Sequence, residues 1–236
     1  MSDDYIQKAL RDIREGKMVL IYDFDDREGE TDLTIASQFV TPASIREMRK
    51  KAGGLICTTT HHDICRKLDL PFLADVLACN HDQYPVLQGL APNDLPYDTK
   101  SAFSITINHR RTFTGITDND RALTVSEFAR LAKDSYAMEE GRARAEFGKH
   151  FRSPGHVHLL NSTPQLLSVR KGHTELATAM MVLAGVTPTA TICEMMGDDG
   201  DALSKEKAKR YAERFDLCYL EGKDIIDFWE RGGNGK

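Results

Sequence analysis

The sequence predicts one α+β protein domain of three-layer α/β/α type, in which helices flank a mixed β-sheet. Short apolar runs rich in β-branched residues alternate with segments whose apolar residues recur at helical spacing. Some strands lead into a helix and others return directly to the next strand, so we expect both parallel and antiparallel neighbours. No repeat or linker divides the 236 residues. We therefore assign residues 1–231 to one domain and residues 232–236 to a flexible glycine-rich tail.

The expected helices begin at capping side chains or a proline, and several end at a glycine. They span residues 2–16, 42–53, 64–68, 128–133, 174–184, 205–215 and 225–229. A capping box at residues 124–127 and a cap at Ser204 mark two of the starts. The expected strands span residues 18–22, 33–40, 55–60, 101–108, 157–160, 189–196 and 217–220. Residues 71–100 are expected to form a long, partly irregular connection, and the charged residues 138–149 an exposed helix or insertion.

The composition argues against several classes of protein. Charged residues make up 28% of the chain and the net charge is -5, which argues against a nucleic-acid-binding protein. No apolar run approaches the ~20 residues that cross a bilayer, and the acidic N-terminus does not resemble a signal peptide. Five cysteines without a CxxC pair are typical of reduced thiols. We therefore expect a cytoplasmic protein that binds neither nucleic acid nor a membrane.

The densest group of charges lies in residues 23–32, directly after the apolar run 18–22. It holds six carboxylates together with Arg27 and Gly29. Like charges this close repel one another unless a cation lies among them, and an all-oxygen ligand set suits magnesium. Glu28 and Glu30 beside Arg27 would hold a divalent cation and an anionic substrate together. The alternative is a solvated acidic loop on the surface.

A second candidate site lies at the start of a predicted helix, in residues 170–175. A helix N-terminus presents unpaired N–H groups and favours a phosphate. Arg170 adds a guanidinium that clamps an anion, and Thr174 adds a hydroxyl donor. His173 is placed there to bind a metal or to move a proton. The alternative is a plain capped helix with basic residues on its surface.

Single residues add further candidates. Glu194 lies in a run otherwise fit for burial, where a carboxylate must be paired, bound to a metal or raised in pKa; a structural ion pair is the alternative. His156 follows a turn expected at residues 152–155, and Thr114 lies in a hydroxyl-rich loop, so both are also compatible with ordinary surface positions. Cys57 either faces a site at the end of its strand or is a buried thiol.

Five motifs follow one another along the chain. They are Arg27-Glu28-Gly29-Glu30-Thr31-Asp32, Ala52-Gly53-Gly54-Leu55-Ile56-Cys57, Arg152-Ser153-Pro154-Gly155-His156-Val157, Gly172-His173-Thr174-Glu175 and Cys193-Glu194-Met195. In this order the sequence resembles the 3,4-dihydroxy-2-butanone 4-phosphate synthases of riboflavin biosynthesis, in a stand-alone form similar to the archaeal members. Each motif alone is a weak signal, but five in register make a chance match very improbable. The segment 138–149 matches none of the family's functional motifs, and we expect no fused cyclohydrolase domain.

The resemblance implies a lyase that converts D-ribulose 5-phosphate into L-3,4-dihydroxy-2-butanone 4-phosphate and formate, through a metal-stabilised enediolate, dehydration and skeletal rearrangement. It implies a Mg²⁺ or Mn²⁺ ion on Glu28 and His173, and a homodimer with active sites at the subunit interface, where His156 reaches across. The implied substrate-binding residues are Arg27, Glu28, Asp32, Thr114, Arg170, Lys171, Gly172, His173 and Thr174. The implied catalytic residues are Asp23, Glu30, Cys57, His156 and Glu194.

Two other functions are weighed against this one. Another metal-dependent sugar-phosphate isomerase or aldolase would share the enediolate chemistry, and detection of formate would separate the two. A non-enzymatic nucleotide- or RNA-binding module is the second alternative. The acidic net charge and the lack of a patch of basic and aromatic residues count against that module.

Overall fold

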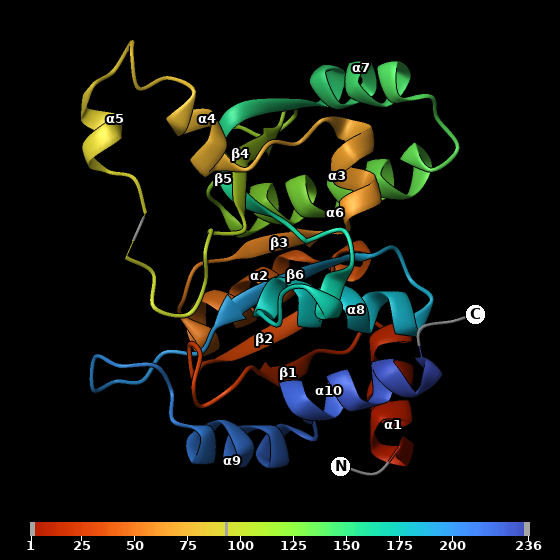
Figure 1. The fold of residues 1–236 in the computed structure, drawn as a ribbon. Helices are drawn as coiled ribbons and strands as arrows, with labels where there is room; N and C mark the ends of the chain where they lie inside the picture. The colour runs from red at the N-terminus through yellow and green to blue at the C-terminus, as the bar shows by residue number, and fades with distance from the viewer. Residues whose placement is uncertain (1–2, 93, 234–236) are drawn as a thin grey trace.

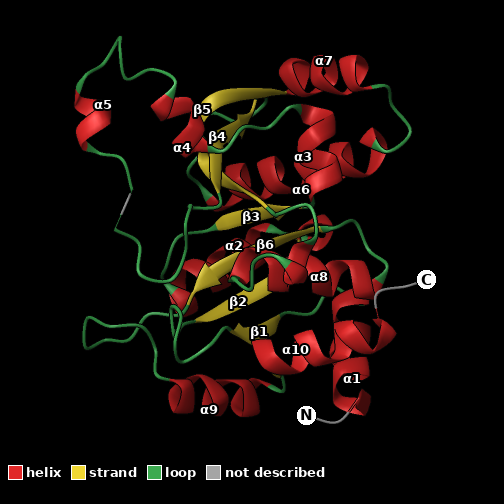
Figure 2. Ribbon diagram, in the orientation of Figure 1, coloured by secondary structure: helices red, strands yellow, loops and turns green. Residues whose placement is uncertain are grey.

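A seven-stranded mixed sheet runs through the middle of the molecule, with helices on both of its faces (Figure 1, Figure 2). The computed structural model describes residues 3–92 and 94–233. The strand order is β4-β5-β3-β6-β2-β1-β7. β1 pairs with β7, and β3 with β5, in parallel, whereas the remaining neighbours are antiparallel. The α/β/α architecture with a mixed sheet that the sequence predicts is confirmed.

The strands are short and mostly buried on both sides. Their bounds are β1 (Val19–Tyr22), β2 (Thr31–Ala36), β3 (Cys57–Thr60), β4 (Phe103–His109), β5 (Phe151–Asn161), β6 (Thr189–Glu194) and β7 (Cys218–Glu221). Successive side chains of a strand point to opposite faces, so Leu20 packs in one hydrophobic core and Ile21 in the other. Because both faces of these strands are buried, their sequences are nearly continuous runs of apolar residues.

One face of the sheet is covered by α2 (Pro42–Glu47), α3 (His62–Leu68), α6 (Asp118–Ser135), α7 (Glu140–His150) and α9 (Lys205–Phe215). The ring of Phe128 on α6 is fully buried and packs edge-on against Phe147 and Phe151. Helix α7 also buries Ala143. The charged segment 138–149 is therefore a helix with an inner face that belongs to the core.

The opposite face is covered by α1 (Asp3–Arg14), α8 (His173–Ala184) and α10 (Gly222–Phe228). Helix α8 is buried along nearly its whole length and ends at Gly185, whose φ of 69° is left-handed, as the sequence predicts. Its first turn reaches the edge of the sheet at which β1 and β6 end and β2 and β3 begin. Polar residues from four strand ends and one helix start therefore meet at this edge.

Residues 71–92 and 94–102 form an arm that extends beyond the β4 side of the sheet, with α4 (Leu73–Ala78) and α5 (Val86–Gly89) inside it (Figure 1). The expected irregular connection is confirmed, with two short helices in place of plain coil. The arm then returns along the edge of the sheet, where Tyr97 and Asp98 line a cavity.

Two local predictions are wrong. Helix α6 begins at Asp118, ten residues before the predicted start, because the Thr117 hydroxyl accepts a hydrogen bond from the Asp120 amide and caps it. Thr124, predicted as a cap, lies inside the helix, where its hydroxyl donates to the Asp120 carbonyl. Residues 152–155 do not form a turn but belong to β5. Gly155 permits this close pairing, because a Cβ atom there would collide with the backbone of Ile107.

Smaller differences occur at element ends. The strand expected over residues 33–40 begins at Thr31 and gives way to a 3₁₀ turn, Ser37–Phe39. Of the expected tail, Gly232 and Gly233 lie in a final helical turn, Trp229–Gly233, and residues 234–236 lie outside the described residues. Among the helices in the described ranges, none has the length and apolar character needed to span a bilayer.

Candidate active site

A cavity of about 490 Å³ opens at the edge of the sheet where the acidic loop, residues 23–32, meets the start of α8. Eight of the residues singled out in the sequence line it: Glu28, Glu30, Asp32, Cys57, Arg170, His173, Thr174 and Glu194. The arm adds Tyr97 and Asp98 to the lining. Residues as far apart in the sequence as Glu28 and Glu194 thus contribute to one pocket.

The acidic loop is shaped by Asp23, which is buried and accepts hydrogen bonds from the amides of Glu28 and Glu30, both at 3.1 Å. Gly29 lies between them with a φ of 69°, a left-handed conformation that favours glycine. The loop is therefore folded around a carboxylate of its own and is not a solvated surface loop.

Arg27 closes the loop from the other side. Its Nη1 atom donates to Asp23 at 3.2 Å and to Glu28 at 2.7 Å, and its side chain is only 9% exposed. Its Nη2 atom donates to Asp98 of the arm at 3.1 Å, and the guanidinium lies over the ring of Tyr97. Arg27 thus connects the acidic loop to the arm.

His173, the first residue of α8, is buried among carboxylates. Its Nδ1 atom lies 3.2 Å from Glu28 Oε2 and 4.0 Å from Asp23, and its Nε2 atom lies 3.9 Å from Asp32. Burial acts to lower the pKa of His173, but Asp32, Glu28 and Asp23 outweigh it and raise the pKa to about 10. Without a metal ion, the imidazolium supplies the positive charge that these carboxylates require.

The same side chains form a set of metal ligands. Ligand atoms of Asp23, Glu28 and His173 all lie within 4.8 Å of one another. One carboxylate oxygen of Asp32, Oδ1, is buried beside them without a hydrogen-bond partner. Two like charges about 4 Å apart repel by about 4 kcal/mol at an effective dielectric constant of about 20. A divalent cation would offset this repulsion between the carboxylates. Carboxylates and an imidazole fit Mg²⁺ or Mn²⁺.

The carboxylates of the cavity differ in how strongly they bind a proton. Burial, opposed by His173 and reinforced by Glu194, raises the pKa of Asp32 to about 8. Burial acts to raise the pKa of Glu28, but His173 and Arg27 outweigh it and lower the pKa to about 2. Burial also raises the pKa of Glu30, with Glu28 and Glu194 adding to the rise. Neighbouring carboxylates in one cavity therefore have divergent proton affinities, which is typical of acid–base sites.

Glu194 ends β6 and is half-buried, directly across from Asp32 on β2. Its Oε2 atom accepts a hydrogen bond of 2.7 Å from the Leu55 amide, so this carboxylate is paired with backbone and not with a structural cation. Gly54 allows this approach, because a Cβ atom there would collide with Glu194. Cys57 is buried at the start of β3, and burial raises the pKa of its thiol well above the usual value. The thiol is therefore protonated at neutral pH.

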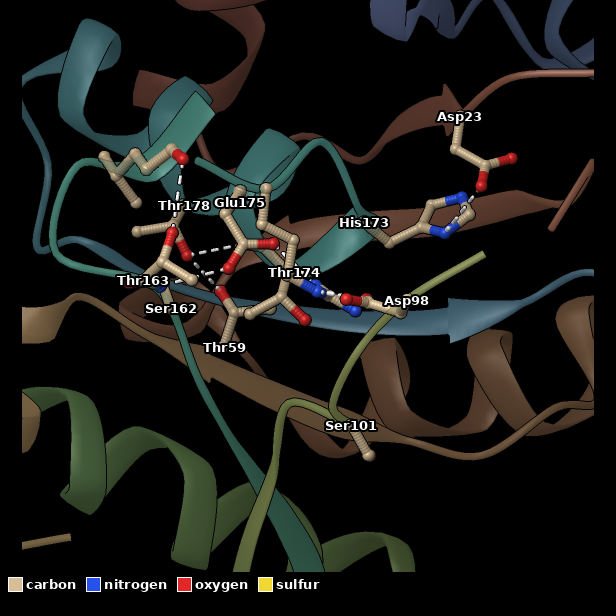
Figure 3. Close-up of polar contacts among 12 residues, drawn as sticks. Asp23, Thr59, Asp98, Ser101, Ser162, Thr163, His173, Thr174, Glu175 and Thr178 are labelled. Atoms are coloured by element: carbon tan, nitrogen blue, oxygen red, sulfur yellow. Dashed lines mark hydrogen bonds and ion pairs between the residues drawn. The ribbon is translucent and has the colours of Figure 1, made fainter. Parts of the chain in front are cut away.

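The start of α8 is held by ion pairs. Gly172 is its N-cap, and Arg170 donates to Asp98 at 2.5 Å and to Glu175 at 2.6 Å. Glu175 is fully buried and also accepts a hydrogen bond from the Thr163 amide. Figure 3 shows this line of contacts from Thr163 through Glu175 toward Asp98. Lys171 is exposed and is not among the lining residues.

Two candidates lie away from the cavity. His156 on β5 is exposed, and its Nδ1 atom is 3.1 Å from the side-chain amide of Asn108. Thr114 is also exposed, and its carbonyl is 3.5 Å from the same amide. Neither His156 nor Thr114 lines the cavity. Within one chain, therefore, they form a second polar cluster around Asn108.

Asp98 and Glu175 were missed in the sequence as site residues. Glu175 is the last residue of the motif Gly172-His173-Thr174-Glu175, and a carboxylate on a helix expected to be buried was an available signal. Asp98 lies in a proline-rich stretch without periodicity, so no local pattern distinguished it from other loop carboxylates.

Comparisons with known proteins identify the family of the chain. A family model described as 3,4-dihydroxy-2-butanone 4-phosphate synthase matches residues 7–228. Relatives of that name from Methanothermobacter thermautotrophicus and Archaeoglobus fulgidus are 47% and 43% identical, over 94% and 95% of this chain and 94% of each relative. A crystal structure titled 3,4-dihydroxy-2-butanone 4-phosphate synthase in complex with two magnesium ions superposes with a TM-score of 0.74 at 25% identity, over 98% of this chain and 99% of that one.

These matches do not favour the isomerase, aldolase and nucleic-acid-binding alternatives. They extend over nearly the whole chain and include the acidic loop, the start of α8 and the end of β6. The chain belongs to the 3,4-dihydroxy-2-butanone 4-phosphate synthase family.

Proposed function

We propose that the cavity at the edge of the sheet is the active site of the chain. As a family member, the chain is a lyase of riboflavin biosynthesis that converts ribulose 5-phosphate into 3,4-dihydroxy-2-butanone 4-phosphate and formate. One observation carries this location: Glu28 and His173, whose ligand atoms cluster with one of Asp23, line the same cavity as Arg170 and Thr174. A cation site beside an anion site matches a substrate that has both hydroxyl oxygens and a phosphate.

The ion is held, in this proposal, by Glu28 and His173, with Asp23 as a third ligand that the structure adds to the sequence-based pair. Mg²⁺ or Mn²⁺ bound there supplies positive charge against which negative charge on substrate oxygens can develop. Asp32 lines the cavity and is proposed to orient a hydroxyl of the substrate through Oδ1, which lies 3.9 Å from His173 and has no hydrogen-bond partner among the described residues.

The substrate phosphate is bound, in this proposal, at the start of α8. Arg170, the amides that follow Gly172 and the hydroxyl of Thr174 offer donors to it, and the helix end favours a negative charge. Arg27 contributes a second guanidinium close to Arg170, and Lys171 adds positive charge from the surface.

Proton transfers fall to carboxylates that line the cavity. Glu30 and Glu194 both face it, and the Leu55 amide fixes one oxygen of Glu194 so that the other is left for the substrate. Asp23 positions the acidic loop in addition to any proton it moves. Cys57, as a neutral thiol, shapes the wall beside them.

His156 and Thr114 enter the same site from a second subunit. We propose a homodimer in which the partner subunit's His156 and the partner subunit's Thr114 complete each cavity. Their distance from the cavity in one chain supports this arrangement, as do the exposed apolar side chains of Phe113 and Ile116, which are 93% and 51% exposed. We also propose that residues 1–231 act as one catalytic domain in the cytoplasm, which the single continuous sheet and the five free cysteines support.

The test is to incubate the protein with ribulose 5-phosphate and to measure formate. We expect formate in the presence of Mg²⁺, loss of more than about 90% of the rate after removal of metal with EDTA, and recovery when Mg²⁺ or Mn²⁺ is added. Formate production that is insensitive to EDTA would disprove the metal assignment. The absence of formate with metal present would disprove the function itself.

A further inference from the structure

Asp98 connects two cationic side chains that come from distant segments of the chain. Its Oδ2 atom accepts hydrogen bonds from Arg27 Nη2 at 3.1 Å and from Arg170 Nε at 2.5 Å. Arg27 belongs to the acidic loop and Arg170 precedes α8, whereas Asp98 comes from the arm. All three side chains are largely buried, with exposures of 9%, 15% and 12% for Arg27, Arg170 and Asp98.

The two guanidiniums repel each other, and each is anchored separately at its far side. Arg27 is held by Asp23 and Glu28, and Arg170 by Glu175. Among the residues that the structure describes, Asp98 is the one carboxylate that pairs with both arginines. Because partly buried like charges repel more strongly than charges in water, a shared counter-ion is needed to keep the two guanidiniums together.

The shared contact leaves donors free for a ligand. Within the described part of the chain, Arg27 Nε and Arg170 Nη2 take part in no hydrogen bond. Gly172 lies against both arginines, because a Cβ atom there would come within 2.5 Å of Arg170 Nη1 and 2.7 Å of Arg27 Nη2. Two guanidiniums thus converge on the backbone that starts α8, where an anionic group is to be bound.

We propose that Asp98 is a positioning residue for substrate binding: it clamps Arg27 and Arg170 together so that both present donors to the phosphate of the substrate. The inference rests on the proposed function, since it assumes that the phosphate lies at the start of α8. Asp98 acts through the arginines and does not itself touch the reacting atoms. It also ties the arm to the cavity, because Tyr97 beside it stacks on Arg27.

The test compares Asp98→Asn with the wild-type enzyme by measuring kcat, KM for ribulose 5-phosphate and the inhibition constant of inorganic phosphate. Asparagine keeps the shape and one acceptor but removes the charge that both arginines share. A charge-assisted hydrogen bond is stronger than a neutral one by about a factor of two, so we expect KM and the inhibition constant to rise together by about tenfold. We expect kcat to fall by less than about threefold, and Asp98→Glu to restore part of the loss.

Asp75→Asn is the matched control. Asp75 lies on the same arm and pairs with Lys100, but this pair is exposed and outside the cavity. We expect its KM and its inhibition constant to equal those of the wild-type enzyme. Thermal unfolding of both variants establishes that each is folded at the assay temperature.

Three outcomes would overturn the inference. If KM and the inhibition constant do not change in Asp98→Asn, Asp98 does not position the arginines. If both constants fall, Asp98 competes with the phosphate for the arginines. If kcat falls and KM stays constant, Asp98 acts in a chemical step. A wild-type enzyme that is active with metal in the same assay shows that the proposed function holds in each of these cases.

Discussion

The two polar clusters that carry the motifs of this chain differ in burial and in charge. The cluster of the acidic loop and α8 is buried, and His173 lies among Asp23, Glu28 and Asp32. In the second cluster Asn108 is buried, but His156 and Thr114 are exposed and both contact its side-chain amide. In the first cluster the charges are paired with one another within one chain, whereas the second presents polar side chains on the surface. In the proposed homodimer, the first cluster would assemble on folding and the second would gain its role on association.

The largest effect is expected when the buried cluster is broken. Glu28→Ala or His173→Ala removes a proposed metal ligand, and we expect formate production to fall by about a thousandfold, equivalent to about 4 kcal/mol of transition-state stabilisation. Isothermal titration with Mg²⁺ would show the loss of binding directly.

Asp26→Ala is the matched control for this prediction. Asp26 lies in the same loop but is exposed and does not line the cavity. We expect its activity and its Mg²⁺ affinity to equal those of the wild-type enzyme. Normal Mg²⁺ affinity in Glu28→Ala and in His173→Ala would show that the ion is bound elsewhere.

The next effect tests whether the exposed cluster belongs to a neighbouring active site. His156→Ala removes a group that moves protons, and we expect a loss of about a hundredfold in kcat. When inactive Glu28→Ala and inactive His156→Ala chains are mixed, half of the dimers are mixed. Each mixed dimer has one intact site if the partner subunit's His156 completes it, so about a quarter of the wild-type activity should return. No recovery on mixing would place both residues in the site of a single chain.

The smallest effect tests how the exposed cluster is positioned. β4 and β5 approach closely at Gly155, whose amide donates to Thr106 Oγ1, and this brings the His156 amide to 2.9 Å from Asn108 Oδ1. A Cβ atom at Gly155 would collide with the backbone of Ile107, so we expect Gly155→Ala to lower the free energy of unfolding by about 2 kcal/mol. Gly148→Ala in α7 has open space around the new atom and should raise that free energy by about 0.5–1 kcal/mol. Urea denaturation measures both, and equal stability of the two variants would refute the packing argument.

Most of the fold could be predicted from the spacing of apolar residues, because that spacing follows the period of the helix or strand whose buried face they form. The boundaries of α9, its Ser204 cap and the Gly185 end of α8 follow from local chemistry alone. The start of α6 did not, because two Thr-x-x-acid signals occur in succession and only the first, at Thr117, has a hydroxyl that accepts a hydrogen bond from the amide three residues later. The turn expected at residues 152–155 failed because proline and glycine also occur in a strand that bends against its neighbour.

The sequence by itself determined the kind of chemistry, since carboxylates, an arginine and a histidine in ordered motifs already indicate a metal ion and an anionic substrate. Only the tertiary structure decided which of them share a cavity. Asp23 lies beside the proposed metal ligands, and Asp98 accepts hydrogen bonds from both arginines, because the sheet edge brings together segments that are far apart in the chain. His156 and Thr114 lie outside that cavity for the same reason, since β5 carries His156, and the loop after β4 carries Thr114, to another surface. Residue types encode possible reactions locally, whereas distances and burial arise only when the whole core has formed.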